Sequence, residues 1–321
     1  MASKRRTWFL VRVAVYLAVI TGLLLWRGGV DWRARLRELR GAPAGEAVLT
    51  VSGRDLAPAL VDRLLALYLQ DYPHISIATA GGGTNHALED LVNGRADVAL
   101  LYRQPTAAEQ DLFRAASGDT ALVFPVAVAA AVLLAGARAP ADSLALDELR
   151  AALAGQAPAP WARFYAPDPN DGLWDAVRSR LELPADVADA LPVTWLADGP
   201  AVAAAVAADD SAWGLVSTFG VPTDSLGLPL TAARTVHLRA EADAAAAAPS
   251  RAAVAAGDYP LHHRLLAACA AGGNFEGAKF VTHLASGRGQ RQVERAGALP
   301  ARQVAREVYL TRQPVGKGTV D

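Results

Sequence analysis

Cysteine is almost absent from this chain of 321 residues, because Cys269 is the only one. An intramolecular disulfide is therefore impossible, and a metal site built from several cysteines is excluded. A single cysteine is compatible with an oxidising compartment but does not demonstrate one.

Patterns typical of catalytic and metal sites are missing as well. The six histidines form no pair at i,i+4 spacing together with a glutamate, which a helical zinc site would need. No Gly-x-Ser-x-Gly nucleophile elbow occurs in the sequence. We therefore expect a protein that is not an enzyme and that has no cofactor and no metal ion.

The main body of the chain lacks the positive charge that nucleic-acid-binding domains carry. Residues 1–45 hold nine Lys or Arg against two acids, which leaves 22 basic and 30 acidic side chains in residues 46–321. This acidic body argues against nucleic acid as a partner. An anion bound here must be captured by local dipoles, because the overall field repels it.

One long apolar run is present near the amino terminus. It spans Trp8–Trp26, nineteen residues, which is just long enough to cross a bilayer, with a tryptophan at each end like an interfacial anchor. No small-residue cleavage site follows it. We expect an uncleaved signal anchor, with a cleaved signal peptide and a buried core helix as the alternatives. Residues 1–45 would then be a membrane anchor and a juxtamembrane linker, whose orientation charge alone does not settle.

The stretch Glu46–Ala108 alternates between strand and helix patterns. A β-branched run at Val48–Val51 is followed by apolar residues at helical spacing, and a second alternating strand at Ile75–Thr79 ends at Gly81–Gly83. A strand-helix-strand unit of this length predicts a parallel sheet with right-handed crossovers. Both turns then lie where helices begin, so free backbone N–H groups converge there and suit a small anion.

Further strands and helices are expected along the rest of the chain, which makes the fold class α/β. The apolar run Ala121–Gly136, broken by Pro125, is too short for a second membrane span and fits buried strands linked through a crossing point. An amphipathic helix is expected over Ser143–Gly155, with Ser143 as its cap. The other expected elements are a strand at Trp213–Val216 and helices at Leu173–Leu181, Pro200–Ala208, Asn274–Ser286 and Gly289–Ala296.

Several segments, in the right order, resemble the phosphate-binding periplasmic proteins of ABC uptake systems, a branch of the type 2 solute-binding protein family. Ala80–Asp97 resembles the family's Gly-rich helix start followed by a Gly-x-x-Asp turn, and Ala212–Val216 resembles one of its strands. Phe280–Pro300 closely resembles its carboxyl-terminal motif. The series of similar segments extends over residues 46–312.

The resemblance implies the two-lobe type 2 periplasmic-binding-protein fold, with the ligand held in a cleft between the lobes. Lobe I would consist of residues 46–125 and 218–312, lobe II of residues 126–217, and residues 313–321 would form a tail. The crossings between the lobes would fall near Phe124–Val126 and near Val216–Gly220.

The family holds its oxyanion with hydroxyl and backbone N–H groups at helix starts. Carried over by position, the resemblance implies these ligand-binding residues: Ser52, Gly53, Asp55, Gly83, Thr84, Asn85, Arg103 and Gly172. Asp171 and Leu173 stand where the family has hydroxyls, and Leu100–Tyr102 stands where it has a carboxylate that accepts the phosphate proton. We therefore expect weak or absent phosphate affinity. Arg54 or Arg103 would either substitute as the cation or form a salt bridge.

These patterns predict a membrane-anchored, extracytoplasmic solute-binding protein of the phosphate ABC-transporter type. Its ligand would be a small oxyanion, phosphate foremost, and its partner an ABC permease. It would cross the cell inner membrane once, with its soluble domain in the periplasm. The alternative is a sensor or protein-interaction module without a transport role, in which the phosphate pocket is degenerate.

Overall fold

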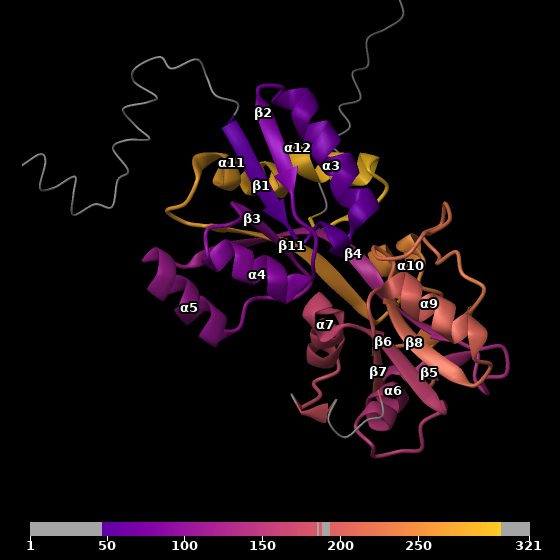
Figure 1. Cartoon of the computed structure of the whole chain (residues 1–321). Coiled ribbons are helices and arrows are strands. Elements are labelled where there is room, and N and C mark those ends of the chain that lie inside the picture. The colour runs from indigo at the N-terminus through magenta and orange to yellow at the C-terminus, as the bar shows by residue number, and fades with distance from the viewer. Residues whose placement is uncertain (1–46, 185, 188–192, 303–321) are drawn as a thin grey trace, which may run out of the picture. The chain divides into compact units, whose positions relative to one another are not determined.

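The computed structural model describes residues 47–184, 186–187 and 193–302 (Figure 1). The expected membrane anchor and the expected carboxyl-terminal tail lie outside these residues. No helix of the described part combines the length and the apolar character that are needed to cross a bilayer.

The described part alternates strands and helices, as an α/β fold requires. The strands are β1 (Ala47–Ser52), β2 (Ile75–Thr79), β3 (Val98–Leu101), β4 (Ala121–Ala135), β5 (Ser143–Ala145), β6 (Arg163–Pro167), β7 (Val193–Leu196), β8 (Ala212–Ser217), β9 (Arg234–Thr235), β10 (His237–Arg239), β11 (His262–Ala270) and β12 (Leu299–Pro300). The α-helices are α3 (Pro58–Asp71), α4 (Thr84–Val92), α5 (Ala107–Ser117), α6 (Leu146–Leu153), α7 (Leu173–Arg180), α9 (Gly199–Ala208), α10 (Arg251–Ala256), α11 (Phe275–Ala285) and α12 (Gly287–Arg295). Two short 3₁₀ helices precede α3 and α7, η1 (Arg54–Leu56) and η2 (Pro169–Asp171).

The strands form a mixed sheet in the order β2-β1-β3-β11-β4-β8-β6-β7, and β9 and β12 also pair with β4. The long strand β4 pairs with two different strands along its length. Ala121–Ala130 pairs with β11, and Ala131–Ala135 pairs with β8. We call β2, β1, β3, β11 and the first part of β4 the first half-sheet, and the second part of β4 with β8, β6 and β7 the second half-sheet. We call the elements around the first half-sheet the first lobe and those around the second half-sheet the second lobe.

The strand β4 continues through Pro125, where the sequence predicted separate strands. The pairing register with β11 shifts between Leu265 and Leu266, and Leu266 pairs with Pro125 itself. A bulge of this kind accommodates a proline, because the residue has no N–H to give to the ladder. The single strand therefore links the two half-sheets directly.

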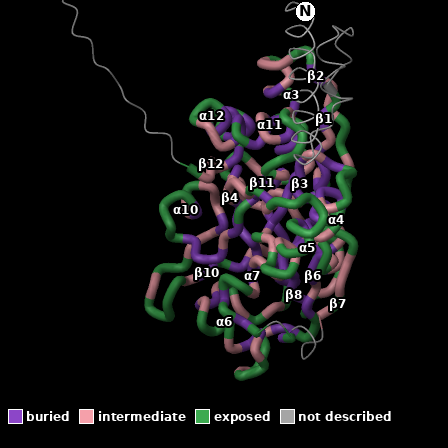
Figure 2. The backbone as a smooth tube through the Cα atoms, turned by 90° about the vertical axis from the view of Figure 1, so that its left-hand side faces the viewer, coloured by how far each residue is buried: buried purple, intermediate pink, exposed green. Residues whose placement is uncertain are grey.

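The first half-sheet is covered on both faces, and the alternation of side chains along β3 shows how. Val98 and Leu100 belong to a core cluster that includes residues of α3 and α11, whereas Ala99 and Leu101 belong to a second cluster with residues of α4 and α5. Successive side chains of a strand point to opposite faces, so an entirely apolar strand is buried on both. Buried stretches accordingly gather on the strands in Figure 2, and exposed ones on outer helices and loops.

The predicted helix at Ser143–Gly155 begins later than expected. Ser143–Ala145 is the strand β5, which pairs with β10, so Ser143 is not the helix cap. Glu148 instead accepts a hydrogen bond from the Ala145 N–H at 2.7 Å, at the start of α6. β5 forms by pairing with β10, which lies more than ninety residues further along the chain. The local helical spacing does not reveal this pairing.

After β8, the chain stays beside the second half-sheet for two more strands. Residues Arg234–Thr235 of β9 pair with the end of β4, and β10 pairs with β5. The next strand, β11, belongs to the first half-sheet. The lobe boundaries given above stay a prediction, and these pairings favour a return to the first lobe near β11.

Candidate functional site

The first expected ligand turn follows β1. Gly53 has a φ of +87°, and a Cβ there would lie 2.6 Å from the Leu100 carbonyl oxygen, so the position needs glycine. The side chain of Ser52 is fully buried, and its hydroxyl donates a hydrogen bond to Asp90 at 2.7 Å. This expected ligand hydroxyl is therefore used inside the first lobe.

Asp55 connects the first turn to the second. Its carboxylate accepts the Gly82 N–H at 2.8 Å. In anion-binding turns, a backbone N–H group of this kind donates its hydrogen bond to the bound solute. Here a carboxylate of the chain itself takes it.

The second expected turn lies at the start of α4 and directly contacts the turn before α7. The Thr84 hydroxyl accepts the Tyr102 N–H at 3.0 Å and donates to the Asp171 carbonyl oxygen at 2.7 Å. A Cβ at Gly83 would lie 2.2 Å from the Asn170 carbonyl oxygen, and one at Gly172 would lie 2.6 Å from the Thr84 hydroxyl. We call this contact of residues 83–84 with residues 170–172 the seam. It leaves no room for an oxyanion between Thr84 and Gly172.

Arg103 and Asn85 extend the seam. Arg103 forms an ion pair with Glu109 at 2.7 Å, donates to the Asn85 amide oxygen at 2.6 Å and has its Nε 3.2 Å from Asp175 of α7. The Asn85 amide in turn donates to the Asn170 side chain at 3.3 Å. Hydrogen bonds from Arg103 lower the pKa of Glu109 to about 2, although burial opposes this. Of the two roles left open for Arg103, the contacts correspond to the salt bridge.

Arg54 also has a partner outside any ligand site. It forms an ion pair with Asp62 at 2.6 Å on the exposed surface of the first lobe. A pair in this position is strongly screened by water and salt.

A cavity of about 720 Å³ opens beside the seam, and we call it the cleft. Its lining comes from both lobes and includes five carboxylates: Asp55, Glu89, Asp168, Asp171 and Asp198. Among the described residues that line it there is no Lys or Arg, and His86 is its one imidazole. The local field of the cleft is therefore negative, which disfavours a multiply charged anion.

Asp171 is the carboxylate that this environment affects most. Burial raises its pKa to about 6, helped by the negative charges of Asp168 and Asp198 and opposed by a hydrogen bond from the Leu173 N–H. The neighbouring Leu173 is 1% exposed and packs in the core, so its side chain is not directed into the cleft. The two positions that replace the family's hydroxyls thus have different surroundings.

A buried polar network that was not predicted from the sequence lies where the two half-sheets meet. The Tyr102 hydroxyl donates to the Leu56 carbonyl oxygen and lies 3.4 Å from the Ser217 hydroxyl, which is 2.8 Å from His263 Nε2. Burial lowers the pKa of His263 to about 3, so its ring is neutral. The three side chains come from separate segments, since Tyr102 follows β3, Ser217 ends β8 and His263 lies in β11, and no motif joins them in the sequence.

This serine–histidine pair does not have the arrangement of a catalytic one. Ser217 and His263 are 3% and 5% exposed, and the other ring nitrogen of His263 has no hydrogen-bond partner in the described structure. A nucleophile needs access to substrate and a base that a third group orients. Within the described residues, no group of three or more His, Cys, Asp or Glu could hold a metal ion.

Comparison with known proteins identifies the family. A model of the PBP superfamily domain matches residues 40–286. The chain belongs to the PBP superfamily. The resemblance of the sequence predicted a member of this superfamily, and no curated protein matches the chain in a search by sequence.

Solved structures show the same fold at low sequence identity. A putative phosphate ABC transporter substrate-binding protein with bound phosphate from Clostridium perfringens has a TM-score of 0.61 at 15% identity, covering 79% of this chain and 100% of that one. An ABC-type phosphate transport receptor from Vibrio cholerae has a TM-score of 0.55 at 18% identity, covering 78% and 99%. The CcmR regulatory domain of Synechocystis PCC6803, solved with 2-PG, has a TM-score of 0.50 at 14% identity, covering 75% and 96%. The PBP superfamily member described here thus shares a two-lobe α/β fold with all three.

Proposed function

We propose that this chain is a membrane-anchored, extracytoplasmic solute-binding protein that closes its two lobes around a small solute and delivers it to an ABC permease. The observation that carries the proposal is the meeting of two helix-start turns, residues 82–84 and 170–172, at one edge of the cleft. Helix starts carry partial positive charge, so they suit polar solutes. The anchor would be Trp8–Trp26, in the inner membrane, with the lobes in the periplasm.

A phosphate-like oxyanion is the first ligand to test, because the resemblance and the phosphate-bound relative both suggest it. The ligand residues proposed are Ser52, Gly53, Asp55, Gly83, Thr84, Asn85, Arg103 and Gly172. For an oxyanion to reach the Thr84 hydroxyl, the bond from Thr84 to the Asp171 carbonyl would have to break. The five carboxylates of the cleft would oppose the anion, so we propose weak phosphate binding.

The second candidate is a sensor or interaction module that works without transport. It is supported by the direct contacts between the lobes: Thr84 to Asp171, Asn85 to Asn170 and Arg103 to Asp175. The fold also serves as a regulatory domain in CcmR. A protein whose lobes are joined by such contacts would signal through its surface rather than through uptake of a solute.

Calorimetric titration of phosphate into the full chain distinguishes the two candidates. The wild type is compared with Thr84→Ala, which removes a proposed donor, and with Asp171→Ser, which removes a negative charge and adds a hydroxyl. Binding that weakens in Thr84→Ala and strengthens in Asp171→Ser supports an oxyanion in the cleft. Glu89→Gln is the matched control, since it removes a cleft charge away from the seam. Absence of phosphate binding in all four proteins favours the second candidate.

A further inference from the structure

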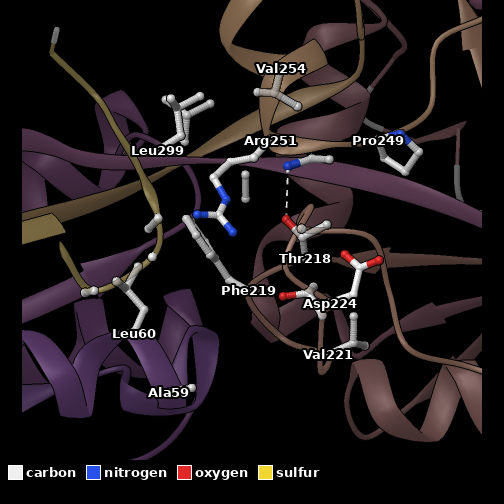
Figure 3. A pocket seen from close by; sticks show the side chains of 18 of the residues that line it. Ala59, Leu60, Thr218, Phe219, Val221, Asp224, Pro249, Arg251, Val254 and Leu299 are labelled. Atoms are coloured by element: carbon white, nitrogen blue, oxygen red, sulfur yellow. Dashed lines mark hydrogen bonds between the residues drawn. The ribbon is translucent and has the colours of Figure 1, made fainter. Parts of the chain in front are cut away.

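A second cavity, of about 550 Å³, lies beside the segment that connects β8 to the rest of the chain. Figure 3 shows Phe219, Val221 and Thr218 of this segment on one side and Leu60 of α3 and Leu299 of β12 on the other. We call it the hinge pocket. The cleft is lined by Gly220, whereas the hinge pocket is lined by its two neighbours, so the two cavities share this segment as a wall.

The hinge pocket contains two guanidinium groups. Arg63 of α3 donates to the Ala296 carbonyl oxygen at 2.9 Å, and Arg251 of α10 donates to the Ser225 carbonyl oxygen at 3.2 Å. In Figure 3 the Arg251 side chain extends into the cavity. Each guanidinium carries five N–H groups, so one hydrogen bond to the chain leaves most of them able to donate to a ligand. No ion pair joins either group to a carboxylate of the described residues.

One acid lines the hinge pocket, and its position is fixed by the backbone. Asp224 accepts the N–H groups of Leu226 and Leu228, both at 2.9 Å, through one carboxylate oxygen. With two guanidiniums against one carboxylate, the titratable charge of the hinge pocket is positive. This is the opposite of the cleft, although the body of the chain is acidic as a whole.

The rest of the hinge pocket combines apolar side chains with the hydroxyl-bearing residues Thr218, Thr223 and Ser225. Among the apolar side chains, Leu60, Val221 and Val254 are each less than 9% exposed, and Val128, Phe219 and Leu299 add to the apolar surface. Ligand sites of this kind combine apolar walls with a few polar groups that fix orientation. The matching ligand has one anionic group for the guanidiniums and an apolar body for the wall.

We propose that the hinge pocket is a binding site for a small monocarboxylate with an aromatic or aliphatic body, distinct from the cleft. Its carboxylate pairs with Arg251 and Arg63, and its body packs against Phe219 and Val221. Arg63 lies on a helix of the first lobe, and residues 218–227 follow the last strand of the second half-sheet. A ligand that joins them restrains the movement of the lobes, and so links this site to the cleft.

The test uses hydrocinnamate, with the neutral isostere hydrocinnamamide as the matched probe, in calorimetric titrations of the full chain. Hydrocinnamate is expected to bind, and hydrocinnamamide to bind at least about tenfold more weakly, because it lacks the charge that pairs with guanidinium. Arg251→Gln and Arg63→Gln are each expected to weaken hydrocinnamate binding by about tenfold or more. Arg264→Gln is the control, since Arg264 is exposed on β11 and lines neither cavity.

Three results would overturn the proposal: no binding of hydrocinnamate, equal binding of the acid and the amide, or binding that neither arginine variant changes. The comparison of the two probes needs no variant, so it decides the question even if an arginine variant does not fold. Loss of binding in Asp171→Ser with normal binding in both arginine variants would assign the probe to the cleft and would also overturn it.

Discussion

The hydroxyl of Thr84 illustrates, at the scale of one residue, how a group expected to hold a ligand is used by the fold. It accepts the Tyr102 N–H from its own lobe and donates to the Asp171 carbonyl oxygen across the seam. Both partners would be left without a hydrogen bond if the hydroxyl were removed. A buried polar group without a partner costs more free energy than the net gain from forming the bond.

The first prediction therefore concerns Thr84→Val, which keeps the shape of the side chain and removes the hydroxyl. We expect the free energy of unfolding to fall by about 1–3 kcal/mol, measured by urea denaturation. Thr84→Ser keeps the hydroxyl and is expected to lose less. Equal stability of the valine variant and the wild type would mean that the Thr84 bonds contribute nothing in solution.

The second prediction concerns Asp171, whose pKa burial raises from 3.8 to about 6. The native state then holds its proton more tightly than the unfolded state. The stabilisation that comes from this tighter proton binding is fully present below about pH 4. The free energy of unfolding then falls by up to about 3 kcal/mol as the pH rises through about 6. Asp171→Asn mimics the protonated form, so we expect it to be more stable than the wild type at neutral pH and equal to it at pH 4.

The measurement is the difference in unfolding free energy between the wild type and Asp171→Asn across this pH range. Contributions from other groups, such as the neutral His263, cancel in the difference. Asp210→Asn is a control, because Asp210 is exposed and pairs with Arg138 away from the cleft. A difference that does not change with pH would show that Asp171 titrates like an exposed carboxylate.

At the scale of elements, the seam depends on how closely the starts of α4 and α7 approach each other. Gly83 has an ordinary negative φ, so its backbone conformation does not require glycine. The absence of a side chain matters here only because it lets the two helix starts come close together. A Cβ there would meet the backbone of Asn170 at 2.2 Å and that of Asp171 at 2.6 Å. Backbone atoms cannot move aside as the end of a flexible side chain can.

The third prediction follows for Gly83→Ala. The added methyl group must push the two turns apart, so we expect a loss of about 1–3 kcal/mol of stability and faster amide exchange at Tyr102, whose N–H is bonded to Thr84. Hydrogen-exchange mass spectrometry measures the second effect. Gly272→Ala is the matched control, since nothing lies within 4 Å of a Cβ at that position. Unchanged exchange in the Gly83 variant would mean that the lobes do not meet at the seam in solution.

Elements that are determined by the spacing of residues within their own segment could be predicted from the sequence. The spacing of apolar residues between Val51 and Pro73 predicted a helix, and α3 buries Leu60, Val61, Leu64, Leu65 and Tyr68 of that pattern. Elements defined by distant partners could not be predicted as well. β5 exists because β10 pairs with it, and β4 continues through Pro125 because it pairs with β11 across a bulge at Val126. In both cases the deciding residues lie about a hundred positions or more away.

At the scale of the whole molecule, the same distinction separates the family from its site. The order of motifs along the chain was enough to predict a superfamily that the comparison then identified. The use of each hydroxyl was not predictable, because Ser52 and Thr84 bond to residues 38 and 87 positions away. The two replaced positions, Asp171 and Leu173, were noticed in the sequence. Their different surroundings, one lining the cleft and one in the core, appear only in the fold.

The last prediction concerns the attachment of the molecule to a membrane. The run Trp8–Trp26 is nineteen residues long and no small-residue cleavage site follows it, so we expect the mature protein to keep it. The full chain should then remain with membranes after washing at alkaline pH, and mass spectrometry of the native protein should find the sequence before Trp26. Leu17→Lys places a charge near the middle of the span, at a cost of about 3 kcal/mol, and should reduce the membrane-bound fraction, whereas Leu17→Ile should not. A native amino terminus beyond Trp26 would show instead that the run is a cleaved signal peptide, and the two lobes would then be released as a free protein.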